Sequence, residues 1–308
     1  MLGDELSYVA LVVRDVDAAS KVFGDCLGLK KTDLDAEGTK VPVFSVGQSA
    51  LALFPLGHAY VDGFAKPGVH HVALGSKSLD DGIAAARKAG VPSLGAVRPG
   101  LGGGQRIALD PTATATVKTW ITTPLSIEAS SSSHVERIDH LGIASADNRV
   151  AVDAWTTRLG RPLESQQTDM EVAIPVESFT SDKYGVVYHS RAPEPIGGLR
   201  VSFITVGDCE LEFLQNFDPR HGAQVDAAQA GTTRQDQGAI TKFIASRGAG
   251  LHHVAFKASD INRTLAALDK AGITVIDHVG RPGSRRGLIG FVHPSGTGGV
   301  LVHFVQRD

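Results

Sequence analysis

The sequence predicts an α+β protein of four βαβββ modules that pair into two domains, each an open, cupped mixed sheet with its helices outside. One observation behind this prediction is a repeated phrase, GVHHVAL at 68–74 and GLHHVAF at 250–256. Another is an order of short strand-like and helical patterns that recurs four times along the chain. Such self-similarity is typical of a unit that cannot bury its sheet face alone and packs beside a copy of itself.

A serine-rich stretch marks the boundary between the two predicted domains. The residues SIEASSSSHVER (126–137) are polar and have the composition of a linker. We therefore expect a first domain at 1–125, a linker at 126–135 and a second domain at 136–308. The 308 residues are enough for two cores of ordinary size.

Each module is expected to begin with a strand, to continue with a helix and to end with short strands. In the first half these segments are LSYVALVV, DVDAASKVFGDCLGL, PVFSVG and SALALFP, then GVHHVALGS, SLDDGIAAARKAG, GQRIALDP and ATVKTWITT. In the second half they are RIDHLGIAS, NRVAVDAWTTRLG, GLRVSFITVG and CELEFLQ, then GLHHVAFKA, DINRTLAALDKAG, GLIGFVHP and GVLVHFVQ. Two insertions, 171–198 and 218–240, interrupt this order. Segments of this length usually cover or shape a site, and flexible surface loops are the competing interpretation.

The composition excludes several classes of partner. A formal charge of −3 gives no electrostatic reason to expect binding to nucleic acid or to anionic lipid. No apolar run approaches the roughly 20 residues that span a bilayer, so no membrane anchor is expected. Cys26 and Cys209 fall in different halves, which favours a reduced, cytoplasmic protein without a disulfide framework.

Four potential metal ligands occupy matching places in the strands of the second half: His140, Glu212, His253 and His303. Their counterparts in the first half are expected to be Tyr8, Ala52, His71 and Thr119. Only one of these counterparts is a potential ligand, so the first domain is expected to be a degenerate, metal-free copy. A pseudo-twofold packing of the modules would bring the second set together on the concave face, and three imidazoles with one carboxylate suit Zn, Fe, Co, Ni or Mn.

The alternative is a purely structural role for these four residues, because a lone histidine on a strand is more often a hydrogen-bonded core or surface residue than a ligand. Alternation in CELEFL places Glu210, Glu212 and Leu214 on one face of their strand. A row of carboxylates on a polar outer face is then the competing interpretation. We favour the inner face because the first-half counterpart of Glu212 is an alanine.

At these residues the chain resembles the vicinal oxygen chelate (VOC) superfamily, which includes glyoxalase I, methylmalonyl-CoA epimerase and several dioxygenases. The second half is most similar to the epimerases over about residues 136–308, through IDHLGIAS, VGDCELEFLQ, GVLVHFVQ and above all GAITKFIASRGAGLHHVAF. The resemblance implies paired βαβββ modules around one divalent metal ion, held by His140, Glu212, His253 and His303. His303 stands where the epimerases and dioxygenases have a glutamate, so it is either a ligand or a free acid/base beside the metal.

The resemblance also implies an enzyme that binds two neighbouring oxygens of a substrate, removes an α-proton and stabilises the resulting enolate. Glu194 is the expected general base, with Tyr188 and His189 as alternates. The loop RPGSRRG (281–287) offers three side chains for a substrate carboxylate or phosphate: Arg281, Arg285 and Arg286. Solvated turn arginines are the competing interpretation of this loop.

Three functions stay open at this stage. The first is a metal-dependent epimerase, isomerase or lyase acting on a small oxygenated acid, ketone or acyl thioester. The second is a non-haem Fe(II) dioxygenase of the ring-cleaving or 2-oxoacid type, in which two histidines and one carboxylate hold the iron. The third is a non-catalytic binding module. The first half is expected to replace the partner subunit of a shorter enzyme, although a homodimer of the whole chain stays open.

Overall fold

The computed structural model describes residue 3, residues 5–217 and residues 238–307. The first module consists of β1 (Glu5–Val13), α1 (Val16–Lys21) continued by the wider turn η1 (Val22–Cys26), β2 (Lys31–Ala36), β3 (Thr39–Val46) and β4 (Ser49–Pro55). The second module consists of β5 (Gly68–Gly75), α2 (Leu79–Lys88), β6 (Ser93–Pro99), β7 (Gln105–Leu109) and β8 (Thr119–Thr122).

The second half repeats this order with two additions. Its first module consists of β9 (Arg137–Ala144), α3 (Asn148–Val152) continued by η4 (Asp153–Arg158), β10 (Leu163–Ala173), the extra strands β11 (Val176–Ser181) and β12 (Gly185–Ser190), β13 (Glu194–Val206) and β14 (Cys209–Phe217). An extra helix follows, α4 (Ala239–Arg247). The last module consists of β15 (Gly250–Lys257), α5 (Ile261–Lys270), β16 (Arg281–Pro282), β17 (Leu288–Val292) and β18 (Leu301–Gln306).

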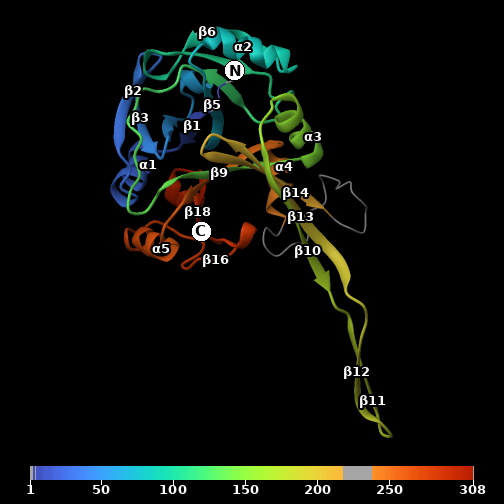
Figure 1. Ribbon diagram of the computed structural model, residues 1–308. Coiled ribbons are helices and arrows are strands. Elements are labelled where there is room, and N and C mark those ends of the chain that lie inside the picture. The colour runs from blue at the N-terminus through green and yellow to red at the C-terminus, as the bar shows by residue number, and fades with distance from the viewer. Residues whose placement is uncertain (1–2, 4, 218–237, 308) are drawn as a thin grey trace.

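Two sheets of eight strands result, and they correspond strand for strand (Figure 1). The first sheet has the order β2-β3-β4-β1-β5-β8-β7-β6 and the second has the order β10-β13-β14-β9-β15-β18-β17-β16. In both, the opening strands of the two modules pair antiparallel at the centre, and each opening strand runs parallel to the closing strand of its own module. The predicted fold of four βαβββ modules in two cupped sheets is confirmed.

The helices begin where the sequence provides an oxygen for the first free backbone N–H groups. Asp15, Ser78, Asp147 and Asp260 stand immediately before α1, α2, α3 and α5, and each side chain accepts a hydrogen bond from a backbone N–H of the first turn. These four helices lie on the outer side of the sheets (Figure 1), whereas α4 places Ile240 on the concave side of the second sheet. Their buried faces and the outward strand faces of both domains form one continuous core, in which Phe23 and Phe256 approach with ring centroids 6.2 Å apart.

The serine-rich segment between the domains is held against the first domain. Gly47 and Ser130 exchange two backbone hydrogen bonds of 2.6 and 3.1 Å, and the Ser132 hydroxyl donates to the Leu27 carbonyl at 2.6 Å. The segment therefore has fixed contacts despite its linker-like composition.

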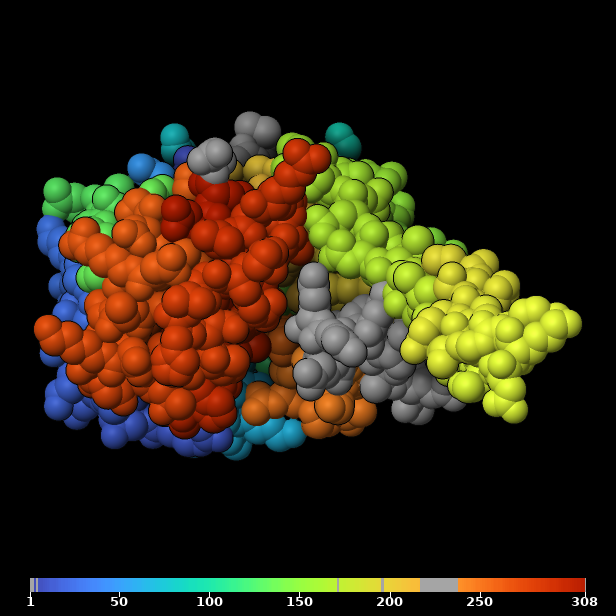
Figure 2. Space-filling model, turned by 90° about the horizontal axis from the view of Figure 1, so that it is seen from below, coloured from blue at the N-terminus to red at the C-terminus, as the bar shows by residue number. Residues whose placement is uncertain are grey.

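The insertion at 171–198 forms an arm that leaves the body of the protein (Figures 1 and 2). The arm consists of the outer parts of β10 and β13 and of the two-stranded sheet β11–β12 at its tip. Apolar side chains on it are exposed, among them Met170, Ile174, Phe179 and Tyr188. The expectation that this insertion covers the site is wrong for this conformation, because its two strands pair with each other and extend outward. Of the other insertion, only residues 238–240 are described, and they begin α4.

Among the described residues, no helix combines the length and the apolar character that crossing a membrane requires.

Candidate metal centre

Two β-bulges aim side chains into the second cup. Between β9 and β15 the pairing shifts register at Asp139 and again at His252, so each is an extra residue in its strand. A bulge lets two consecutive side chains lie together instead of on opposite faces. Accordingly, His140 Nδ1 lies 2.9 Å from Asp139 Oδ2, and His253 Nδ1 lies 3.1 Å from His252 Nδ1.

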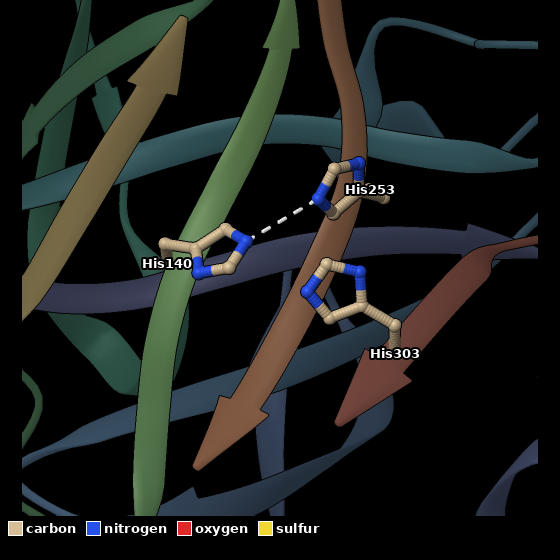
Figure 3. Close-up of side chains that lie close together, drawn as sticks. All are labelled: His140, His253 and His303. Carbon is tan, nitrogen blue, oxygen red and sulfur yellow. Dashed lines mark hydrogen bonds between the residues drawn. The ribbon is translucent and has the colours of Figure 1, made fainter. Parts of the chain in front are cut away.

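Four side chains from four strands meet on the concave face of the second sheet: His140 from β9, Glu212 from β14, His253 from β15 and His303 from β18. Figure 3 shows the three imidazoles pointing toward one another. His140 Nε2 lies 3.5 Å from His253 Nε2, and Glu212 Oε2 lies 3.2 Å and 3.5 Å from these two nitrogens. One nitrogen of each histidine lies within 4.8 Å of one nitrogen of both others. All four are buried.

These distances fit a shared cation. Two donors that are each about 2.1 Å from one ion lie about 3.0–3.4 Å apart, close to the separations among His140, Glu212 and His253. Both ring nitrogens of His303 are buried without a hydrogen-bond partner, which is costly for a polar group that has no further role. The donors therefore fit a divalent transition metal held by three imidazoles and one carboxylate.

Three of these four groups have charge states that suit ligation, because a ligand must be deprotonated, whereas His140 would have to release a proton on binding a metal. Burial favours the protonated acid at Glu212, yet His140 and His253 beside it hold the pKa of its carboxyl well below the usual range. Burial lowers the pKa of His253, and it lowers that of His303 further, helped by the neighbouring histidines. Burial also works against the charged form of His140, but Glu212 and Asp139 outweigh it and raise the His140 pKa to about 9.

A layer of ion pairs supports the four donors from outside. Asp139 is fully buried and accepts from His140, and it lies 3.1 Å from Arg307 Nη2. Glu210 lies 2.6 Å from Arg285 Nη1, and the Arg285 guanidinium stacks on the Phe203 ring at 3.6 Å. Residues that orient a metal-bound histidine in this way fix its tautomer and tune its basicity.

Gly142 makes room for the centre. It faces His253 across the β9–β15 pair, and a Cβ at this position would overlap the His253 ring. The corresponding residue of the first sheet, paired with His71, is Ala10. Sequence reasoning missed Asp139, Gly142, Glu210 and Arg307. The available signals were the position of Asp139 and Gly142 on either side of His140 in IDHLG and the alternation that puts Glu210 on the face of Glu212.

The donors open into a cavity of about 290 Å³. Its walls are largely apolar, with Leu199, Phe203, Leu214, Ile240 and Phe291 around the donors. Three arginines also reach it: Arg281, Arg285 and Arg307. Such a mixture of apolar walls and a few convergent polar groups is typical of a site for a small ligand.

The remaining predicted site residues are distributed unevenly. Arg281 lines the cavity and pairs through Nε with Asp277 at 3.1 Å, and Arg285 lines it with Nε and Nη2 buried and without a hydrogen-bond partner. Arg286 is exposed and is absent from the lining. Glu194, Tyr188 and His189 are exposed on the arm, and the structure does not bring them to the four donors.

In the first domain, the same cup is filled with aromatic side chains. By strand register His303 corresponds to Trp120, so the expected counterpart Thr119 is wrong by one residue. Trp120 stacks on His71 with ring centroids 3.5 Å apart, and the Arg106 guanidinium lies 4.1 Å from the Trp120 ring centroid. The Tyr8 and Tyr60 hydroxyls are 2.8 Å apart. These contacts occupy the positions where the second cup has its donors.

The fold and the four converging donors define a two-domain protein of the VOC type. The sequence model of the glyoxalase/bleomycin resistance protein/dioxygenase superfamily matches residues 139–291, and the chain belongs to this superfamily. The mitochondrial methylmalonyl-CoA epimerase of Bos taurus is 26% identical over 139 residues, which are 44% of this chain and 70% of that protein.

Two solved structures share the fold over essentially the whole chain. A variant of 4-hydroxymandelate synthase from Streptomyces coelicolor is 15% identical, covering 100% of this chain and 94% of that one with a TM-score of 0.64. The Mn(II)-bound glyoxalase from Novosphingobium aromaticivorans is 16% identical, covering 99% and 82% with a TM-score of 0.60. Relatives in this superfamily include enzymes of epimerase and dioxygenase type.

Proposed function

We propose that this protein is a metal-dependent enzyme of epimerase, isomerase or lyase type, which removes a proton next to a carbonyl group of a small oxygenated acid, ketone or acyl thioester. The observation that carries the proposal is the convergence of His140, Glu212, His253 and His303 at the inner end of a largely apolar cavity. These four would hold one Zn, Fe, Co, Ni or Mn ion. Such an ion, when bound, would act as a Lewis acid that polarises a carbonyl oxygen.

The other residues of the cavity bind and orient the substrate. Arg281 and Arg285 place guanidinium groups on the lining. Nε and Nη2 of Arg285 have no hydrogen-bond partner, although Nη2 lies 3.8 Å from Asp139 Oδ2, and they are donors for a substrate carboxylate or phosphate. Phe203 and Phe291 exclude water from the volume between these arginines and the donors. Asp139 keeps the proton of His140 on Nδ1, so that Nε2 points to the centre.

The number of ligands separates this proposal from a dioxygenase. Four protein ligands leave about two positions of an octahedral ion, which suits two neighbouring substrate oxygens, whereas three leave a further position for O₂. His140, Glu212 and His253 alone have the composition of the two-histidine, one-carboxylate iron site, so the dioxygenase is the second candidate. His303 decides between the two, as the fourth ligand in the first case and as a free acid/base in the second.

The general base under this proposal is Glu194, with Tyr188 and His189 as alternates. Among the described lining residues, the ionisable groups other than arginines are the four donors and His252, and burial lowers the pKa of His252 to about 3. A base must then come from elsewhere. Glu194 lies on the arm, so this assignment requires the arm, or that of a second copy, to reach the cavity.

Metal analysis of wild-type protein and of His303→Ala, combined with two assays, tests the proposal. With a panel of 2-oxoacids and acyl thioesters in deuterated water, we expect α-proton exchange that depends on added metal and no oxygen uptake. His303→Ala should bind the metal more weakly. Oxygen uptake with Fe(II) and full metal content in His303→Ala would support the dioxygenase instead, and a wild-type chain that takes up no divalent ion would contradict both candidates.

A further inference from the structure

A second cavity, of about 370 Å³, lies at the seam between the two domains and is separate from the four donors. Its walls come from both halves of the chain, around the places where β5 and β15 begin. The first histidine of each repeated phrase faces it, His70 from β5 and His252 from β15. The seam cavity is thus built from equivalent parts of the two domains.

The charged side chains in the described lining of the seam cavity are all positive. Arg14 and Lys118 of the first domain and Arg247 of the second line the seam cavity, and its described lining contains no aspartate or glutamate. Arg247 donates through Nη1 to the Pro67 carbonyl at 2.7 Å, a hydrogen bond that joins the domains, and no carboxylate among the described residues forms an ion pair with its guanidinium. Cations collected in a concave site without carboxylates attract anions.

Lys118 is the best placed of the three cations. Its Nζ lies 3.2 Å from His70 Nε2, and burial lowers its pKa, with Asp62 acting in the opposite direction. That aspartate is paired with Arg98 at 2.9 Å, and neither residue belongs to the lining. Lys118 therefore donates to a neutral imidazole and retains ammonium protons for a ligand.

Two aromatic rings give the seam cavity an apolar part. Phe64 lies under Lys118, with Nζ 5.0 Å from the ring centroid, and contacts His70 edge-on at 5.0 Å. On the other side Phe243 contacts His252 edge-on at 4.7 Å and lies 5.8 Å from the Arg247 guanidinium. One phenyl ring and one imidazole from each domain therefore face the same volume, together with two cations of the first domain and one of the second.

We propose that the seam cavity binds a small organic oxyanion, with one phosphate or carboxylate group held by Arg14, Lys118 and Arg247 and an apolar, flat body held between Phe64 and Phe243. The cations set the charge of the ligand, because guanidinium and ammonium groups form charge-assisted hydrogen bonds with such oxygens. The two phenyl rings favour a ligand with a flat, apolar part, because flat apolar groups stack on phenyl faces. This site is independent of the proposed chemistry at the metal centre.

Titration calorimetry with phenyl phosphate on the whole chain, freed of metal by a chelator and dialysed, tests the proposal. We expect saturable binding that inorganic phosphate and benzoate compete for and that phenol does not. Lys118→Gln and Arg14→Gln should each weaken the affinity about tenfold or more, the loss of one charge-assisted hydrogen bond. Lys88→Gln, a matched change on the exposed side of α2, should leave the affinity unchanged.

Absence of saturable binding, or equal affinity in Lys118→Gln and wild-type protein, would overturn the proposal. Binding that appears only after metal is restored would also overturn it, because the anion would then be at the metal centre. The thermal midpoint of each variant, measured without ligand, shows that it is folded. Because the titration uses metal-free protein, its result is distinguishable from success or failure of the proposed enzymatic function.

Discussion

Gly142 and His253 face each other across the central strand pair of the second sheet, and the His253 ring occupies the space that a side chain on Gly142 would fill. Gly142→Ala should therefore displace one of the four proposed metal ligands without removing it. We expect the variant to fold and to lose most of its bound metal, measured by elemental analysis after dialysis. Ala10→Gly, at the equivalent place in the first sheet, is the control and should retain metal at wild-type content. Full metal content in Gly142→Ala would show that His253 does not bind through the ring position described here.

Asp139→Asn should weaken metal binding without changing any of the four donors. The substitution keeps the shape of the side chain but removes the charge that orients His140 and helps to raise its pKa. Loss of such a partner typically costs about 10–100-fold in metal affinity. Competition with a chromogenic chelator measures the change, and Asp153→Asn, an exposed aspartate near Arg158, is the control. Equal affinity in both variants would exclude an orienting role for Asp139.

His70 should make the first domain sensitive to acid. Burial, with Lys118 and Arg106, lowers its pKa to about 3, whereas an unfolded chain has a histidine pKa near 6.5. Between these values the unfolded chain binds a proton that the folded chain does not. The stability that His70 contributes is therefore present above about pH 6.5 and is lost as the pH falls toward about 3.

His70→Gln removes this proton uptake. The thermal midpoint of the variant, measured in steps from about pH 7 to about pH 4, should fall less steeply than that of wild-type protein. The slope is the readout, since the absolute midpoint also reports lost contacts with His71 and Lys118. Parallel curves for the two proteins would contradict the prediction.

The exposed apolar side chains of the arm lead us to predict that the chain self-associates. Phe179, Tyr184, Val186 and Tyr188 at its tip are each more than half exposed, and a two-stranded ribbon with apolar faces is rarely stable alone in water. We expect light scattering to show a dimer of the whole chain. Phe179→Lys combined with Val186→Lys should shift the mass toward the monomer, and Lys183→Gln, a change in the turn of the same hairpin, should not. A monomeric wild-type chain at all concentrations would contradict the prediction.

The fold could be predicted from the sequence because each module repeats the same local pattern. The packing follows because equivalent modules pair with each other. The four donors were accessible for the same reason, since comparison of equivalent strands singled out Glu212 against Ala52. The assignment of His303 to Thr119 was wrong by one residue, a shift that moves the counterpart to the opposite face of its strand. Strand pairing identifies Trp120 as the counterpart of His303.

Other features depend on contacts between distant segments and leave no local pattern. The bulges at Asp139 and His252 appear only when two strands are paired, so the sequence did not indicate that consecutive side chains share a side. The arm was misjudged because the length of an insertion does not tell in which direction it extends. The pairing of Glu210 with Arg285 joins β14, in the inner part of the second sheet, to the turn between β16 and β17 at one of its edges.

His252 belongs to the walls of both cavities, and its ring touches that of His253. This imidazole, together with Leu301, thus stands between the seam cavity and the four donors. Any coupling between two such neighbouring sites is reciprocal. The factor by which an anion in the seam cavity changes the affinity for a cation at the four donors equals the factor by which that cation changes the affinity for the anion.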